Sequence, residues 1–254
     1  MKRARREVVL KSPREIEIMR EANVHAAEIL ECMARAVVPG ATTWDLDHIA
    51  RTELKRRGVK SPFLGYHGYP ATVCTSVNEE IVHGIPSKAR VLCEGDIVGI
   101  DFGVICKGYV GDLARTVPCG KVSAEAERLL RVTRECLERA IAVCTPAFRL
   151  SDIARAIQTH AEENGYSVVR DFVGHGIGTQ MHEDPQVPNY YDGPKPRLSP
   201  GLVIAIEPMV NQGTYEAEVL SDGWTAVTRD RKLSAHFEHS VAITQGEPIV
   251  LSRI

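Results

Sequence analysis

The sequence lacks an apolar run that approaches the roughly 18 residues of a membrane-spanning helix, and it lacks a strong net charge. Lys and Arg number 31 against 33 Asp and Glu, a formal net charge of -2, so the composition shows no sign of a DNA-binding or membrane protein. The seven cysteines form no Cys-x-x-Cys pair, which favours reduced thiols in a cytoplasmic protein over a disulfide framework. The 254 residues suffice for one domain with a hydrophobic core.

The N-terminal segment 1–11 is expected to be a basic tail. A secretion signal would continue into an apolar core, whereas this segment runs into Lys11 and Arg14. The basic residues 2–6 offer contact with ribosomal RNA, but we expect a solvated terminus.

Capping signals predict four helices. Ser12, followed by Pro13 and Glu15, begins the first helix, and Pro39-Gly40 is expected to end it. The second helix is expected from Thr42 to Gly58, the third from Ser123 to just before Pro146, and the fourth from near Ser151-Asp152 to Asn164-Gly165.

Two aspartates lie inside apolar segments on either side of Lys107-Gly108, a pattern typical of a β-hairpin. Pairing the strands about Cys106-Lys107 would set Asp101 roughly opposite Asp112. Two facing carboxylates destabilise a sheet unless one takes a proton or a cation lies between them. Backbone donors at turns would satisfy each aspartate separately, but metal binding is our preferred interpretation.

A second group of polar residues follows the fourth helix. His175 lies between Gly174 and Gly176, which would let the backbone approach a ligand closely. Glu207 ends an apolar strand, and Glu238 lies inside another. Four converging carboxylates require cations, and oxygen ligands with one imidazole suit two divalent ions of manganese, iron(II), cobalt or zinc.

Short matches between the two halves of the chain indicate an ancient duplication. The segments 49–51, 83–85 and 95–101 recur in the same order as 153–155, 175–177 and 201–207, at offsets of 104, 92 and 106. We therefore predict a single catalytic domain over 1–254, with half-repeats at 12–120 and 121–254. In this prediction Asp101 corresponds to Glu207 and His83 to His175, and a shared site lies between the halves.

The motifs resemble those of the type I methionine aminopeptidases over nearly the whole chain. They are Gly65-Tyr66-His67-Gly68-Tyr69-Pro70, Thr75-Ser76-Val77-Asn78-Glu79, Val82-His83-Gly84-Ile85-Pro86, Gly174-His175-Gly176-Ile177-Gly178, Ile206-Glu207-Pro208-Met209 and Phe237-Glu238-His239. The resemblance implies an α+β pita-bread fold, with two pseudo-twofold-related halves and helices covering a curved antiparallel sheet. It also implies two divalent ions, held by Asp101, Asp112, His175, Glu207 and Glu238.

By the same resemblance, His83 and His182 contact substrate and stabilise the reacting centre without binding metal. The family's methionine pocket falls on Tyr66, Tyr69, Cys74, Met181 and Trp224, with core packing as the alternative for these residues. Phe63 stands where relatives often carry Cys, and Met181 where they often carry Phe. A monovalent-cation site would use carbonyls near Asn78 and Glu80 together with Ser234.

The resemblance implies hydrolytic removal of the N-terminal methionine from nascent proteins whose second residue is small. Glu207 would move the proton of the attacking water. A cytoplasmic monomer with transient ribosome contact is expected. Glu238 follows Glu207 by 31 positions, which leaves no room for the helical insertion of the type II enzymes. The alternatives are an X-Pro aminopeptidase or dipeptidase, and a non-catalytic binding protein on the same fold.

Overall fold

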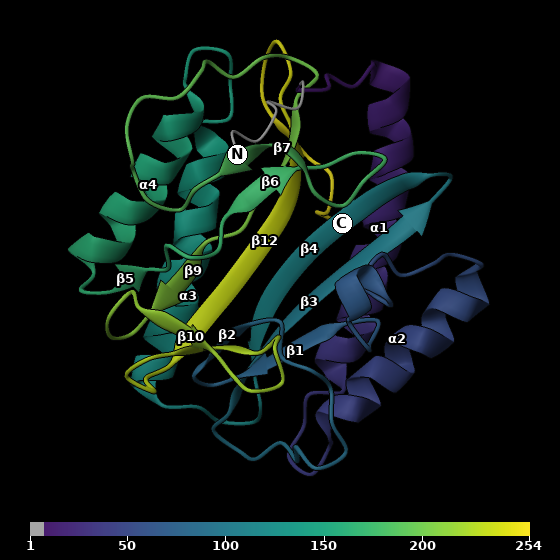
Figure 1. The fold of residues 1–254 in the computed structure, drawn as a ribbon, viewed down its shortest axis with the longest axis vertical. Coiled ribbons are helices and arrows are strands. Elements are labelled where there is room, and N and C mark those ends of the chain that lie inside the picture. The colour runs from purple at the N-terminus through teal and green to yellow at the C-terminus, as the bar shows by residue number, and fades with distance from the viewer. Residues whose placement is uncertain (1–7) are drawn as a thin grey trace.

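The computed structural model describes residues 8–254 as a curved antiparallel sheet flanked by helices (Figure 1). The helices are α1 (Pro13–Arg35), α2 (Thr43–Arg57), the short 3-10 turn η1 (Tyr66–Gly68), α3 (Ala124–Ala142) and α4 (Leu150–Glu163). The strands are β1 (Cys74–Val77), β2 (Glu80–Val82), β3 (Ile97–Cys106), β4 (Tyr109–Pro118), β5 (Ser167–Val168), β6 (Gly174–Gly176), β7 (Glu183–Val187), β8 (Val203–Ile206), β9 (Met209–Asn211), β10 (Ala217–Val219), β11 (Ala226–Thr228), β12 (Ser234–Ala242) and β13 (Ile249–Val250).

The predicted helix starts are confirmed for α1, α2 and α3. The Ser12 backbone N–H donates to the Glu15 carboxylate at 2.7 Å, which completes the capping box of α1. The end of α1 was predicted too late, because the helix stops at Arg35 and tightens into a short 3-10 turn before Pro39. α4 begins at Leu150, slightly earlier than expected. None of the helices within residues 8–254 is long and apolar enough to cross a membrane.

The main sheet is ordered β1-β3-β4-β12-β8-β6-β7, and all its pairings are antiparallel. β12 lies at its centre between β4 and β8, so it joins the strands of the first part of the chain to those of the second. A smaller sheet is ordered β10-β11-β2. This curved antiparallel architecture agrees with the predicted fold class.

The hairpin of β3 and β4 is present, but its predicted register was wrong. The turn is centred on Lys107-Gly108, both with positive φ (50° and 83°), and Cys106 pairs with Tyr109. This two-residue turn suits the right-handed twist of the strands. Asp101 therefore pairs with Ala114, and Asp112 pairs with Gly103.

Alternation along the strands separates the core from the site. Ile100 and Phe102 are fully buried in a cluster shared with α1, so Asp101 between them points to the opposite face. In β12, Phe237 belongs to the core cluster of α3 and α4, and Glu238 points to the other face. In Figure 1, α1 and α3 lie behind these strands. The helices therefore cover one face of the sheet and leave the other for the site, while the half-repeat boundary at residue 120 stays a prediction.

The seven cysteines are all free thiols. Cys32 and Cys93 are exposed, and the other five are buried. The basic residues 2–6 lie outside the described residues. Lys11, which we assigned to the tail, is 6% exposed, and its ammonium donates to the Glu183 carboxylate at 2.6 Å.

Candidate metal centre

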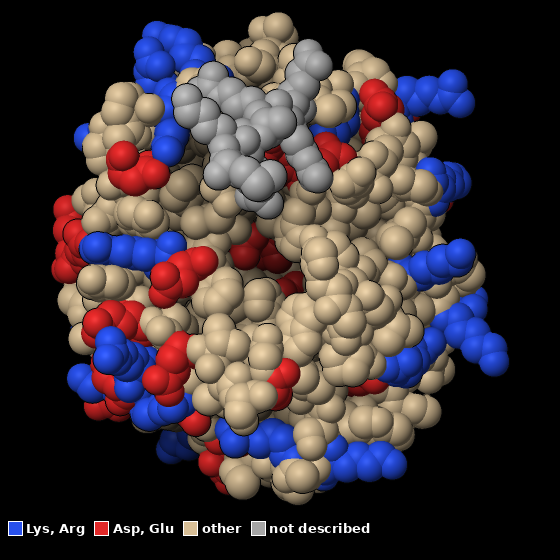
Figure 2. Space-filling view, viewed as in Figure 1, with Lys and Arg blue, Asp and Glu red and all other residues tan. Residues whose placement is uncertain are grey.

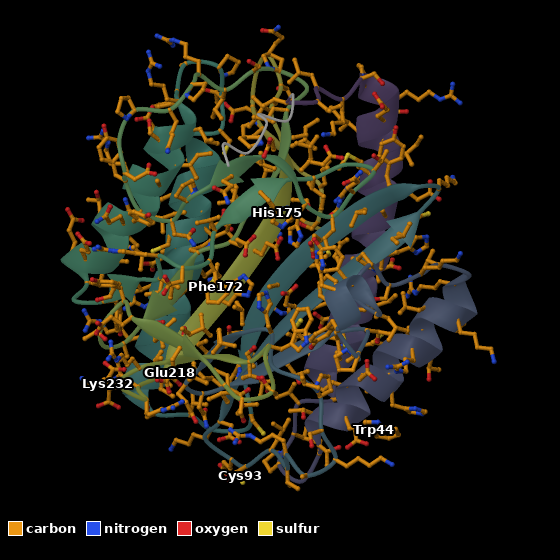
Figure 3. All side chains as sticks on the ribbon, in the orientation of Figure 1. Trp44, Cys93, Phe172, His175, Glu218 and Lys232 are labelled. Atoms are coloured by element: carbon orange, nitrogen blue, oxygen red, sulfur yellow. The ribbon has the colours of Figure 1, made fainter. Side chains whose placement is uncertain are left out.

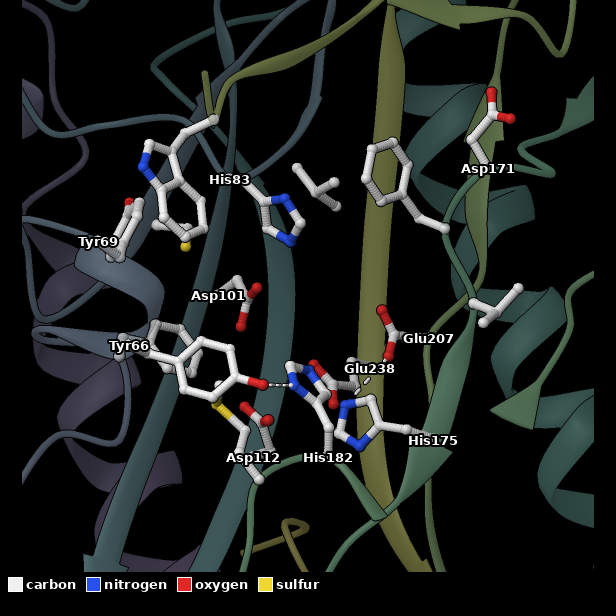
Figure 4. Close-up of a pocket in the computed structure, with 17 residues that line it drawn as sticks. Tyr66, Tyr69, His83, Asp101, Asp112, Asp171, His175, His182, Glu207 and Glu238 are labelled. Atoms are coloured by element: carbon white, nitrogen blue, oxygen red, sulfur yellow. Dashed lines mark hydrogen bonds and ion pairs between the residues drawn. The ribbon is translucent and has the colours of Figure 1, made fainter. Parts of the chain in front are cut away.

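The predicted ligands come from five separate strands or strand ends and line one cavity. Asp101 lies on β3, Asp112 on β4, His175 on β6 and Glu238 on β12, and Glu207 directly follows β8. These side chains converge at the base of a cavity of about 260 Å³ (Figure 4). The space-filling view shows the same hollow near the middle of the face, with carboxylates on its floor (Figure 2).

Three of these residues are close enough to share one ion. One ligand atom each from Asp112, His175 and Glu238 lies within 4.8 Å of the other two. His175 Nε2 also lies 3.4 Å from Glu207 Oε1. Asp101 lies on the same face of the hairpin as Asp112, displaced by two residues along it. Adjacent strands thus bring together residues that are up to 137 positions apart in the sequence.

Two of the four carboxylates are buried without enough hydrogen-bond donors. Asp112 Oδ1 and Glu238 Oε1 are buried and have no hydrogen-bond partner. Burial raises the pKa of Asp112 to about 7, and burial together with neighbouring carboxylates raises the pKa of Asp101, Glu207 and Glu238. Without a cation nearby, these carboxylates would take up protons to reduce their mutual repulsion. The carboxylate oxygens, two of them unpartnered, and the imidazole nitrogen are suitable ligands for divalent cations, which would supply the missing positive charge.

His175 is held in the tautomer that a metal ligand needs. Its Nδ1 lies 3.0 Å from the Gly176 carbonyl oxygen, which only accepts, so Nδ1 carries the proton and the lone pair lies on Nε2. Burial lowers the pKa of this imidazole to about 3, so the ring is neutral near pH 7.

The glycines beside His175 let the neighbouring strands approach closely. A Cβ on Gly174 would lie 2.4 Å from the Ala205 carbonyl oxygen, and one on Gly176 would lie 2.3 Å from that of Asp184. The close approach that the structure shows is to the backbones of the neighbouring strands, and approach to a ligand stays a prediction. The glycines let three strands pack tightly around the imidazole.

The two predicted catalytic histidines also line the cavity. His182 Nδ1 lies 2.6 Å from the Tyr66 hydroxyl, and the ring centroids of His182 and His175 are 4.3 Å apart. His83 has a positive φ of 63°, a backbone conformation that non-glycine residues rarely adopt outside functional or tight turns. Burial, reinforced by His182, lowers the pKa of His83 to about 4.

The residues of the predicted methionine pocket form an apolar and aromatic wall above the carboxylates. Tyr69 and Trp224 meet edge to face at 5.0 Å, and the Tyr69 hydroxyl lies within hydrogen-bond distance of the Val73 and Gly84 carbonyls. The six residues predicted for this pocket all line the cavity; they are Phe63, Tyr66, Tyr69, Cys74, Met181 and Trp224.

Sequence reasoning missed several residues at the site. His236 is buried, its Nε2 has no hydrogen-bond partner, and this atom lies 3.8 Å from Glu207 Oε2. The sequence could have predicted this position, because His236 precedes Glu238 by two residues in a strand and therefore lies on the same face of the sheet. The cavity is also lined by Val82, Asp171, Phe172 and Val173. Figure 3 shows Phe172 and His175 near the centre of the molecule, far from the rim residues Trp44 and Lys232.

The residues predicted for a monovalent cation lie next to one another. The Ser234 backbone N–H donates to the Asn78 carbonyl at 2.9 Å, and the Ser234 hydroxyl lies 2.8 Å from Asn211 Oδ1. Asn78 has a positive φ of 58°. Glu80 accepts from the Val77 N–H at 2.8 Å. The cation itself stays a prediction.

Comparisons with known proteins identify the relatives of the chain. Residues 17–245 match the model of metallopeptidase family M24. A methionine aminopeptidase of Clostridium acetobutylicum is 48% identical over 96% of this chain and 98% of its own length. Methionine aminopeptidase A of Synechocystis is 51% identical over 94% of both chains. The crystal structure of a methionine aminopeptidase from Thermotoga maritima covers 98% of this chain with a TM-score of 0.95 and 44% identity.

The chain therefore belongs to metallopeptidase family M24 and, within it, to the type I methionine aminopeptidases. It has the predicted pita-bread fold. An Xaa-Pro dipeptidase from Bacillus anthracis shares the fold with a TM-score of 0.78 at 20% identity, but this chain spans only 62% of that protein. Family membership also makes the chain a metallo-aminopeptidase that binds divalent metal.

Proposed function

We propose that this chain removes the N-terminal methionine from nascent polypeptides whose second residue is small, and that it uses two divalent metal ions. The observation that carries the proposal is the cavity itself. Its base holds four carboxylates, two buried and two partly buried, with a neutral imidazole, and its wall holds an apolar and aromatic pocket. The base of the cavity is suited to cations, and its wall is suited to an unbranched thioether side chain.

Five residues would hold the ions: Asp101, Asp112, His175, Glu207 and Glu238. Four carboxylates and a neutral imidazole carry four negative charges, which two divalent cations balance. The cation would be manganese, iron(II), cobalt or zinc. When bound, such cations act as Lewis acids and lower the pKa of a water molecule.

Glu207 is the residue we assign to proton transfer. It lies at the end of β8 at the edge of the cluster, within 4 Å of both His175 and His236. Its carboxylate would take a proton from the attacking water and return it to the departing amine. His236 would restrict the orientation of this carboxylate from the neighbouring strand β12.

His83 and His182 would both contact the scissile peptide within the cavity. Both imidazoles are neutral near pH 7, because burial lowers their pKa. A neutral imidazole can donate one hydrogen bond to the oxyanion that develops on the peptide carbonyl. The Tyr66 hydroxyl fixes the ring of His182 through its hydrogen bond to Nδ1.

The closing experiment follows the amino acid released from short peptides. Metal-stripped protein resupplied with manganese or cobalt is expected to release methionine from Met-Ala-Ser, but to leave acetylated Met-Ala-Ser and Leu-Ala-Ser nearly intact. Preferential cleavage of Ala-Pro-Ser would favour the X-Pro aminopeptidase alternative. Two bound ions without cleavage of any peptide would favour a binding protein.

The proposal includes the cellular setting expected from the sequence. The free state of all seven cysteines supports a reducing compartment, and we place the protein in the cytoplasm as a monomer. Transient contact with the ribosome would bring it to nascent N-termini. Co-sedimentation with translating ribosomes tests that part separately from catalysis.

A further inference from the structure

A second group of metal-ligating side chains lies outside the cavity, where α1 packs against the turn end of β3. Glu21 and His25 are four residues apart on α1 and therefore share a face of the helix. Cys106 is the last residue of β3. One ligand atom from each of the three lies within 4.8 Å of the other two. The proposed function uses none of them.

One thiol proton and one ammonium ion lie against the carboxylate of this group. The Cys106 thiol lies 3.8 Å from Glu21 Oε1, and the Lys107 ammonium donates to Glu21 Oε2 at 2.7 Å. Burial and the neighbouring Glu21 raise the pKa of the thiol, so it is protonated near pH 7. A thiol proton and an ammonium ion on the two oxygens of one carboxylate mark a place that attracts positive charge.

We propose that Glu21, His25 and Cys106 form an auxiliary site for a Zn²⁺ ion, with water as the fourth ligand. A carboxylate oxygen, an imidazole nitrogen and a thiolate are an established ligand combination for zinc, and three protein ligands with one water is a recognised arrangement. Binding releases the thiol proton of Cys106 to solvent and displaces the ammonium of Lys107 from Glu21. The side chain of Lys107 is 62% exposed, so its displaced ammonium returns to water.

The remaining neighbour is Arg57, whose NH1 lies 3.4 Å from His25 Nδ1. This guanidinium also binds the carboxylates of Glu28 and Glu53, so it keeps two anionic partners when it leaves the imidazole. The thiolate and Glu21 together neutralise the two charges of the ion. The site would tie α1 to β3, the strand that carries Asp101, and so would fix one wall of the catalytic cavity.

Cobalt is the probe for this site, because a thiolate bound to Co²⁺ gives a near-ultraviolet charge-transfer band that carboxylate and imidazole ligands do not give. We expect the parent protein to show this band at one thiolate per chain and to lose it when Zn²⁺ is added. Cys106→Ser removes the band, whereas Cys32→Ser, on the same helix, and Cys74→Ser, in the catalytic cavity, retain it. A thermal unfolding scan of each variant confirms that it is folded.

Lys107→Asn supplies the complementary test. It removes the competing ammonium while keeping a residue that tolerates the positive φ of this turn. The band should then reach half its maximum at a lower Co²⁺ concentration, and His25→Asn should raise that concentration by about 10-fold or more. The proposal is overturned if the parent shows no band, if the band survives Cys106→Ser, or if Cys74→Ser abolishes it. The catalytic proposal does not depend on any of these results.

Discussion

Asp101 and Asp112 are diagonal neighbours on one face of the β3–β4 hairpin: Asp101 pairs across the strands with Ala114, and Asp112 pairs with Gly103. Diagonal partners lie farther apart than directly opposed ones, which leaves room for cations between their carboxylates. Glu238 on β12 pairs with Ala114 and so adds a third carboxylate beside this pair. The charges converge because three adjacent strands place them on the same face.

Replacing Asp112 with Asn should raise the melting temperature of the protein in the presence of a chelator. The change removes one buried, incompletely hydrogen-bonded carboxylate and the repulsion it exerts on its neighbours. The same variant should lose the stabilisation that manganese gives the parent, which is about 2.7 kcal/mol at a 100-fold excess over the dissociation constant. Thermal unfolding with and without manganese measures both effects. Asp192→Asn on the surface is the control, and equal manganese shifts in both variants would count against Asp112 as a ligand.

Replacing His83 with Asn should lower kcat by about 10²–10³-fold, because the shorter side chain cannot reach the developing oxyanion. Asn tolerates the positive φ of this position. His67→Asn is a matched control, since His67 also has a positive φ (46°) but does not line the catalytic cavity. The manganese-dependent melting shift should be unchanged in both variants. Its loss in His83→Asn would show that His83 acts on the metal rather than on the substrate.

Phe63 and Met181 should be energetically coupled, because both are buried in the same apolar cluster of the cavity wall. Met181→Phe alone adds another aromatic ring to this wall and should raise the KM for a methionyl peptide by overfilling the pocket. Phe63→Cys alone should raise it by leaving a void. The double variant should return closer to the parent value than either single change. Additive effects of the two substitutions would argue that the residues do not shape one pocket together.

The capping box of α1 predicts a pH-dependent stability difference between the parent and Glu15→Gln. Hydrogen bonds from Ser12 lower the pKa of Glu15 from 4.5 to about 2, so its ionised form stabilises the folded state above pH 4.5. This contribution is lost as the pH falls from 4.5 to about 2, and it is at most about 1 kcal/mol for an exposed cap. Urea unfolding at several pH values checks it, with Glu17→Gln on the same helix as control. If the difference in unfolding free energy between the parent and Glu15→Gln grew as the pH fell, the prediction would be contradicted.

Local signals in the sequence predicted much of this fold. Helix starts follow from cap side chains that accept from the backbone N–H three residues later, as Ser12 and Thr42 do, and these local bonds do not depend on the rest of the chain. The hairpin was predictable from its apolar strands. Its register was not, because it depends on which two residues take positive φ in the turn.

The site was predictable as a set of residues but not as a geometry. Buried carboxylates inside apolar strands are unusual enough to be noticed one at a time. Their convergence depends on the order of the strands, which places β12 between β4 and β8. For the same reason the contact between Gly174 and the carbonyl of Ala205 was not predicted, since Ala205 comes from a strand 31 residues farther along the chain.

The most direct test of the account is a titration of metal-stripped protein with manganese, in which bound metal and methionine release from Met-Ala-Ser are measured together. The account predicts that the parent releases methionine only with metal and that the catalytic cavity takes up two ions, while Glu238→Gln loses uptake and activity in parallel. Glu207→Gln should be nearly inactive at saturating metal. Full activity of the chelator-treated parent, or activity of Glu207→Gln within about tenfold of the parent, would contradict it.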